Sequence, residues 1–243
     1  MVVSTTEGSV TTISLDRPDK RNALDEDVLS ALGGAFAQAA EAGARAIVVT
    51  GRGTVFCAGA DLSGPVYEPT FLDKLSDTLK RIETTPVPVI AALNGPALGA
   101  GLQLAMAADL RVMAAEAVVG IPAARLGVAV DEWTIRRLVS LVGGGHARGI
   151  LLGCDLLSAQ TAHVIGFANR IGELSDAQQW AATIAGLAPL SLQHSKLVLN
   201  GDGARDEPPA DRYAAMRRAW QSEDLVEGRA ARTEKRTPQF TGR

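Results

Sequence analysis

The chain has 243 residues, of which 47% are apolar and 21% are charged, and its formal net charge is −3. This composition supports a substantial core and excludes extended disorder. It disfavours nucleic acid as a partner, because the chain has no overall positive field to hold phosphates.

The sequence also shows no pattern typical of a targeting segment or a metal site. No apolar run is long enough to cross a bilayer, and the first residues lack a basic region followed by a long apolar stretch. The two cysteines, Cys57 and Cys154, have no metal-ligand spacing and suit a reducing compartment. We therefore expect a cytoplasmic protein with no membrane span and no metal site.

The first half of the chain alternates between strand and helix patterns. Residues 2–4 and 10–15 flank the turn pair Glu7-Gly8, which predicts a hairpin. Helical spacing of apolar residues predicts helices over about 25–42, around 72–82 and over 101–108, the last apolar nearly all round. Short apolar runs predict buried strands at 46–50, 87–93 and 110–113. This alternation indicates an α/β core.

After about residue 131 the strand pattern nearly vanishes. Ser158 and Ser175 are candidate helix N-caps. The apolar spacing predicts helices over about 131–142, 145–152, 158–165, 175–199 and 211–235.

Two glycine-bearing turns follow buried strands, one at residues 56–62 and one at 94–101. Ligands of open α/β sheets gather outside such strand ends, and small residues let a ligand approach the backbone N–H groups. The second turn also opens the buried helix, whose first N–H groups favour a negatively charged oxygen. Two facing N–H donors would form an oxyanion hole, although glycine turns are also common in packed α/β proteins.

The pair of turns, their order and their spacing resemble the enoyl-CoA hydratase/isomerase (crotonase) superfamily across nearly the whole chain. The further matching segments are Leu15-Asp16-Arg17-Pro18, Asn22-Ala23-Leu24, residues 46–61, 94–109 and 162–171, and Glu234-Lys235-Arg236 through Phe240. The resemblance implies a ββα spiral core over residues 1–190 and a C-terminal helical oligomerisation region over 191–243, which would build a homotrimer or hexamer.

The resemblance also implies a coenzyme A thioester as ligand and no separate cofactor. The N–H groups of Ala60 and Ala100 would bind the thioester oxygen. The helix around 72–82, with Leu72 and Leu75, would line the acyl pocket together with Trp133, whose alternative role is packing its own helix. The residues expected around coenzyme A are Lys20, Arg21, Ala23, Ala58, Asp61, Leu62, Lys235 and Phe240. For the charged ones an ordinary solvated position is the alternative, and for Asp61 a backbone cap.

The positions of the family's two catalytic glutamates are occupied by other residues in this alignment. Gln103 stands at the first and Ala123 at the second, and neither side chain titrates usefully. Asp131 and Glu132 are the nearest alternative acids. Asp131 lies close to where some dehalogenase relatives have a nucleophilic carboxylate, but it also suits a helix N-cap. His146, His163 and His194 lie in the helical half and form no metal pattern.

Three functions are compatible with these features. The leading hypothesis is a fatty acyl-CoA binding protein of lipid metabolism with little or no hydratase activity, similar to mycobacterial paralogues that lack the glutamates, which would present acyl-CoA to lipid-synthesis enzymes. The second is an active hydratase, isomerase or thioester hydrolase of the same superfamily that uses Asp131 or Glu132. The third is an interaction protein without a ligand, which leaves both glycine turns unexplained.

Overall fold

The computed structural model describes residues 1–243, which divide into two compact units. Unit 1 comprises Met1–Val119 and Leu157–Gly201, and unit 2 comprises Gly120–Leu156 and Asp202–Arg243. Because each unit consists of two chain segments, one division of the chain at a single position does not separate the two units. The core and oligomerisation region expected on either side of residue 190 stay a prediction.

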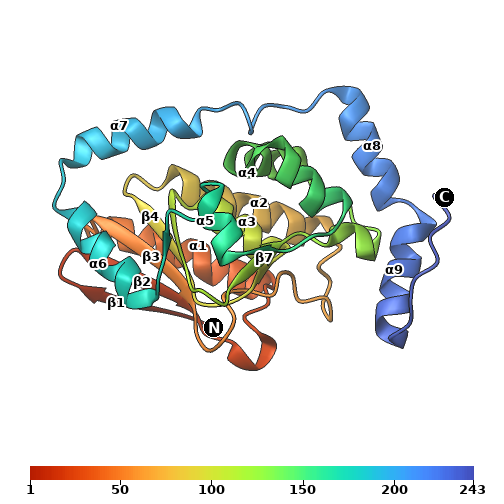
Figure 1. The fold of residues 1–243 in the computed structure, drawn as a ribbon, viewed down its shortest axis with the longest axis horizontal. Helices are drawn as coiled ribbons and strands as arrows, with labels where there is room; N and C mark the ends of the chain where they lie inside the picture. The colour runs from red at the N-terminus through yellow and green to blue at the C-terminus, as the bar shows by residue number, and fades with distance from the viewer. The chain divides into compact units, whose positions relative to one another are not determined.

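Unit 1 is built on a six-stranded sheet (Figure 1). Its order is β1-β2-β3-β4-β6-β9, and every neighbouring pair is parallel except the β1–β2 hairpin. The expected hairpin and buried strands are confirmed; β4 begins two residues late, after Pro88, which has no N–H for the ladder. The strands are β1 (Val2–Glu7), β2 (Val10–Leu15), β3 (Ala46–Gly51), β4 (Val89–Leu93), β6 (Leu110–Met113) and β9 (Arg170–Ile171).

The helices of unit 1 bury its sheet and one another. Alanines and Ile184 of α6 join side chains of the strands in one apolar cluster, and α1 packs on β1, β2 and α2. Helix α3 has all eight residues buried, as its uniform apolar pattern predicts. The helical elements are η1 (Pro18–Lys20), α1 (Glu26–Glu41), α2 (Pro69–Thr84), α3 (Ala100–Ala107), α5 (Ala159–Val164), α6 (Leu174–Ala185) and α7 (Pro189–Asn200).

A second, three-stranded sheet was not anticipated. It has the order β5-β7-β8, with β5 (Ala97–Leu98), β7 (Val118–Gly120) and β8 (Leu157–Ser158). Strands of two or three residues are too short to show a periodic pattern. One of them, β5, lies inside the second glycine turn, so that turn is partly a strand.

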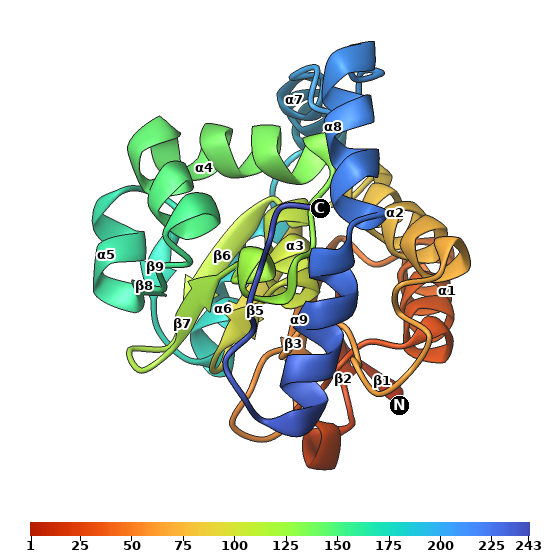
Figure 2. The ribbon, with the colours of Figure 1, turned by 90° about the vertical axis from the view of Figure 1, so that its right-hand side faces the viewer.

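The regular secondary structure of unit 2 is helical, apart from its first residue, which ends β7. It contains η2 (Ala123–Leu126), α4 (Glu132–Leu152), α8 (Ala210–Trp220) and α9 (Glu223–Glu234). The two helices expected over 131–152 are one element with a break at Gly143, where φ is 75°. The last residues run back along α9, because Asp224 accepts hydrogen bonds from the N–H groups of Thr241 and Gly242 (Figure 2).

Two long helices expected from the sequence are each broken in the structure. The one over 175–199 is wrong, because α6 ends before Gly186 and α7 begins at Pro189, which cannot lie inside a helix. Its cap is Glu173 rather than Ser175. The one over 211–235 is wrong too, because the Ser222 side chain accepts the Leu225 N–H and starts a new helix.

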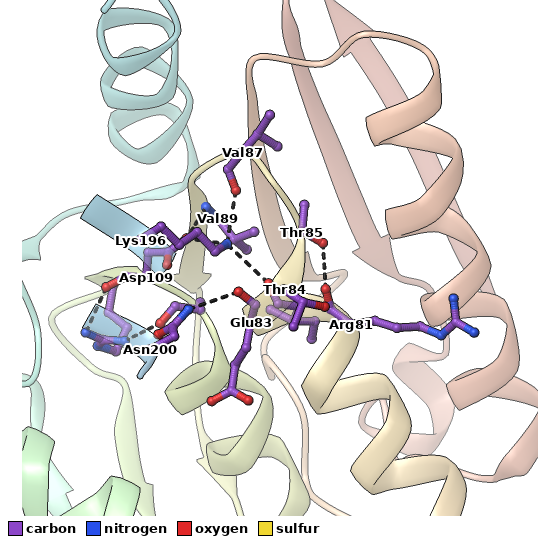
Figure 3. Close-up of polar contacts among 12 residues, drawn as sticks. Arg81, Glu83, Thr84, Thr85, Val87, Val89, Asp109, Lys196 and Asn200 are labelled. Carbon is purple, nitrogen blue, oxygen red and sulfur yellow. Dashed lines mark hydrogen bonds and ion pairs between the residues drawn. The ribbon is translucent and has the colours of Figure 1, made fainter. Parts of the chain in front are cut away.

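A buried lysine anchors α7 to the rest of unit 1 (Figure 3). The Lys196 side chain is 7% exposed, and its ammonium lies 2.7 Å from an Asp109 carboxylate oxygen. It also donates to the carbonyl oxygens of Ile82, in the last turn of α2, and Val87. Asp109 in turn accepts the N–H of Val89, the first residue of β4. The ammonium thus ties three segments that lie far apart in the chain.

Replacing this ammonium is expected to destabilise the fold. Lys196→Met should lower the free energy of unfolding by ~3 kcal/mol, because the Asp109 carboxylate loses its cation and two carbonyl groups lose their donor. Lys80→Met, on the exposed face of α2, is the matched control and should change it by less than about 0.5 kcal/mol. Urea unfolding measures both. Equal stabilities for the two variants would contradict the anchoring role.

No helix of the structure is both long enough and apolar enough to cross a membrane.

Candidate thioester-binding site

The two glycine turns meet in unit 1. The Cys57 N–H donates to the Pro96 carbonyl oxygen, and the Leu98 N–H donates to the Cys57 carbonyl oxygen, at 3.2 and 3.0 Å. Cys57 and Ala97 therefore form a parallel bridge between the loop after β3 and the loop after β4. This approach requires small residues, because a Cβ added to Gly101 would lie 2.2 Å from the Cys57 carbonyl oxygen.

A second bridge fixes Ala60. The Leu24 N–H donates to the Gly59 carbonyl oxygen and the Asp61 N–H donates to the Leu24 carbonyl oxygen, at 2.8 and 2.7 Å. Because both neighbours of Ala60 bond to Leu24, the N–H of Ala60 itself points away from this bridge. Its direction is thus set by the loop that follows β2.

The N–H groups of Ala60 and Ala100 are free to bind a ligand. Neither donates a hydrogen bond within the chain. A Cβ added to Gly59 would lie 3.6 Å from the Ala100 nitrogen, so the two turns converge at this point. Ala100 is the first residue of α3, after Gly99 at a positive φ of 53°, and the start of a helix carries partial positive charge. Two such donors can stabilise an oxygen that develops negative charge.

The titratable groups beside these donors are unsuited to proton transfer at neutral pH. The Asp61 carboxylate accepts the hydroxyl and the N–H of Ser63, and the Ser63 hydroxyl holds the pKa of Asp61 below its usual range. Asp61 therefore caps its own loop and stays ionised. Burial raises the pKa of Cys57 to about 12, so its thiol remains protonated.

Several residues expected around coenzyme A cluster near this site. Lys20 and Arg21 are exposed, and the Arg21 carbonyl oxygen accepts the Ala58 N–H. Ala23 is buried, whereas Ala58 and Leu62 are half-buried. These residues line the same pair of loops as Ala60, which fits the expectation, and a coenzyme A role for them stays a prediction.

The expected acyl-pocket residues of unit 1 lie on α2. Leu75 is buried and Leu72 half-buried, and α2 packs against α3. Gln103, the residue expected in place of the first glutamate, lies in the first turn of α3 and is 7% exposed. Its N–H donates to the Gly99 carbonyl oxygen.

The remaining candidates belong to unit 2, where the two alternative acids have structural partners. Asp131 caps α4 by accepting the N–H and hydroxyl of Thr134, at 2.9 and 2.8 Å. Glu132 accepts from Arg136 at 2.9 Å and from Arg212 at 2.6 Å. The buried Trp133 ring is covered by the Arg205 guanidinium, 4.5 Å from the ring centre. Each of these contacts explains its residue without catalysis.

An apolar groove of about 400 Å³ runs beside α4 in unit 2. Ala123, expected in place of the second glutamate, lines it together with Ile135 and Val139, which are exposed. Lys235 and Phe240 are both exposed, and Lys235 ends α9 in a left-handed conformation. The neighbouring Arg236 pairs with Glu227 through both oxygens and lowers the pKa of that carboxyl to about 2.

The roles of Arg17 and Asn22 were not predicted from the sequence. The Asn22 side chain accepts the Arg17 N–H and donates to the carbonyl oxygens of Arg52 and Val55, so it ties the loop after β2 to the loop after β3. Both residues lie in the opening segment by which the family was recognised. Asn22 is only 1% exposed, but burial is not visible in a sequence, so the local pattern gave no signal of this role.

Comparison with known proteins decides the family. The family model described as enoyl-CoA hydratase/isomerase matches residues 5–243. The chain belongs to the enoyl-CoA hydratase/isomerase family. It is 50% identical over 242 residues to the probable enoyl-CoA hydratase echA6 of Mycobacterium tuberculosis, covering 100% of both chains. The corresponding protein of Mycobacterium leprae is 48% identical over 246 residues, again with full coverage.

Solved structures confirm the expected crotonase-like fold. A methylmalonyl-CoA decarboxylase in complex with 2-nitronate-propionyl-CoA superposes with a TM-score of 0.91 at 26% identity, covering 100% of this chain and 98% of that one. EchA1_1 from Mycobacterium paratuberculosis superposes with a TM-score of 0.87 at 35% identity and the same coverage. The helical C-terminal region agrees with this fold.

Proposed function

We propose that this member of the enoyl-CoA hydratase/isomerase family binds fatty acyl-CoA thioesters and hydrates enoyl-CoA little or not at all. The observation that carries the binding part is that the N–H groups of Ala60 and Ala100 donate to no group of the chain and are held by two backbone bridges. A thioester carbonyl is the acceptor that such a pair suits, because its oxygen gains charge when the bond is polarised. The decarboxylase of the same fold was solved in complex with 2-nitronate-propionyl-CoA, which supports this ligand class.

The chemical part of the proposal rests on side chains. Hydration needs one group to accept a proton from water and another to protonate the carbon next to the carbonyl. Gln103 and Ala123 supply neither, and the Asp61 carboxylate is held ionised by Ser63. The protein would then carry or present acyl-CoA to lipid-synthesis enzymes.

An active enzyme that uses Asp131 or Glu132 is the second candidate. Both carboxylates are engaged, one as a helix cap and one with two arginines, which favours the first proposal. Turnover of crotonyl-CoA by the unmodified protein that is abolished in Asp131→Asn would favour the second. The Thr134→Val variant, which removes a hydroxyl donor to Asp131 but leaves the carboxylate, separates a catalytic from a capping effect.

Acyl-CoA is expected to stabilise the folded protein, and more strongly as the acyl chain lengthens. A ligand present at 100 times its Kd contributes about 2.7 kcal/mol, which for a chain of this size raises the melting temperature by about 5–10 °C. Thermal melting with free coenzyme A, butyryl-CoA and hexadecanoyl-CoA tests this. Equal shifts from free coenzyme A and hexadecanoyl-CoA would contradict the acyl-pocket part of the proposal.

We further propose a homotrimer or hexamer. The supporting observation is α7, whose buried residue is Lys196, while three of its four leucines are exposed and only Leu192 packs against the apolar cluster of unit 1. Leu190, Leu197 and Leu199 are 77%, 73% and 71% exposed, which is unusual for three leucines of one short helix. Light scattering should give a mass of three or six chains, and Leu190→Glu with Leu197→Glu should lower it. A monomer at micromolar concentration would refute this assembly.

A further inference from the structure

Arg17 connects the segments on both sides of the Leu24–Ala60 bridge. One guanidinium nitrogen donates to the Asp25 carboxylate at 2.6 Å and to the Ala23 carbonyl oxygen at 3.0 Å. The other lies 3.5 Å from the Asp61 carboxylate. The side chain is 18% exposed, so these contacts are largely shielded from water. Arg17 therefore holds the residues before and after Leu24 and the residue after Ala60.

This arrangement bears on the direction of the Ala60 N–H. The bridge to Leu24 turns that N–H away from Leu24, so any rotation of the bridge rotates the donor as well. Asp25 is at the same time the N-cap of α1, because it accepts the Val28 N–H at 2.9 Å. Through Asp25 and Asp61, the guanidinium links the loop that contains Ala60 to the start of α1, which is a more rigid element than a loop.

The chemistry of arginine suits this task. Its planar guanidinium presents several donors in a fixed geometry and remains charged at any physiological pH, whereas a lysine ammonium is a single flexible point charge. Asn22 holds the start of the same loop to the loop after β3 through two donated hydrogen bonds. Arg17 then fixes the end of that loop, where Leu24 meets Ala60.

We infer that Arg17 is a positioning residue that aims the Ala60 N–H at the carbonyl oxygen of a bound thioester. This inference rests on the proposed function, because it assumes that a thioester binds at Ala60 and Ala100. The contacts of Arg17 are with Ala23, Asp25 and Asp61, so it would act through the Leu24–Ala60 bridge. A positioning role predicts that removal of the guanidinium weakens recognition of the carbonyl group and leaves the other ligand contacts unchanged.

The test compares two ligands that differ in the carbonyl group alone. Hexadecanoyl-CoA is a thioester, and S-hexadecyl-CoA is the thioether without the carbonyl oxygen. The unmodified protein should bind the thioester more tightly than the thioether. It should also lower the stretching frequency of the ¹³C-labelled carbonyl of the bound thioester, which infrared difference spectroscopy measures. In Arg17→Met the thioester should bind about tenfold more weakly, the loss of roughly one well-placed hydrogen bond, while thioether affinity changes less than about twofold.

Arg52→Met is the matched control. Arg52 pairs with Asp16 at 2.8 Å near the same loops, but its side chain is 54% exposed. This variant should keep both the thioester preference and the carbonyl shift. If Arg17→Met does not fold, Arg17→Lys is the alternative variant, because it keeps the charge but loses the planar group with several donors. It should fold and show a smaller carbonyl shift than the parent.

The outcomes separate this inference from the proposed function. If the parent binds the thioester with a carbonyl shift and the Arg17 variants keep that shift in full, the positioning role is overturned and acyl-CoA binding stands. If the parent binds the two ligands equally and without a shift, the N–H pair does not recognise a carbonyl and both proposals fall. Equal weakening of both ligands in Arg17→Met would reduce Arg17 to a general structural residue and would also overturn the inference.

Discussion

Installing two carboxyl groups by Gln103→Glu with Ala123→Glu is expected to raise the rate of crotonyl-CoA hydration by about 10²-fold over the parent. A positioned general acid or base contributes typically 10²–10⁴-fold, and hydration requires both. The N–H donors at Ala60 and Ala100 are already in place, so the new groups should act on a polarised thioester. The gain should remain below the full product of two such factors, because placement errors near 1 Å cost about 10²-fold.

If both new carboxyl groups act on one thioester, as the family resemblance implies, they repel each other. This repulsion raises the pKa of one carboxyl group, which stays protonated as the acid while the other acts as the base. Loss of enoyl absorbance measures the rate, and Gln103→Glu and Ala123→Glu alone are the controls. Each variant must still bind hexadecanoyl-CoA for the comparison to hold. A parent that hydrates crotonyl-CoA as fast as the double variant would show that Gln103 and Ala123 do not occupy the glutamate positions.

The architecture of unit 1 followed from local patterns in the sequence. Runs such as residues 46–50 are apolar at every position, so they predict strands that are buried on both faces. The helix over Glu26–Glu41 was marked by its apolar spacing and by acidic residues at its start. These signals are local, and the structure confirms them: the residues that the patterns mark as apolar are buried.

Breaks within helical stretches were harder to predict. Residues 175–199 keep an apolar spacing through Gly186 and Pro189, and that spacing hid the break between α6 and α7. Similarly, the helix expected over 211–235 ran through Ser222, although a serine followed by Glu223 and Asp224 is typical of a helix start. Both errors came from weighing periodicity above the individual residues that end or begin a helix.

The candidate site could be predicted in part. Its donors lie in glycine turns that the family resemblance identified, so Ala60 and Ala100 could be named from the sequence. The orientation of those donors depends on pairings such as Leu24 with Ala60, which join residues 36 positions apart in the chain. Such pairings form only in the folded state, and neither composition nor periodicity encodes them locally. The role inferred for Arg17 became visible only with these contacts.

Gly101→Ala is expected to remove thioester recognition and to destabilise the protein. The added Cβ would lie 2.2 Å from the carbonyl oxygen of Cys57 and 2.9 Å from its carbonyl carbon and its Cβ, so α3 must move away from the loop after β3. Overpacking of this kind costs ~1–3 kcal/mol of folding free energy. The same movement displaces the Ala100 N–H, because Ala100 precedes Gly101 in α3.

Gly34→Ala separates this steric effect from the general effect of replacing a helical glycine. Gly34 lies inside α1, and a Cβ there would meet no atom within 4 Å. Alanine should therefore stabilise the protein by about 0.5–1 kcal/mol through its better helix propensity, without altering ligand binding. Urea unfolding and titration with hexadecanoyl-CoA, done in parallel, distinguish the two variants. If Gly101→Ala bound the thioester as tightly as the parent while Gly34→Ala behaved as expected, the close contact between α3 and Cys57 would not be what holds the Ala100 donor in place.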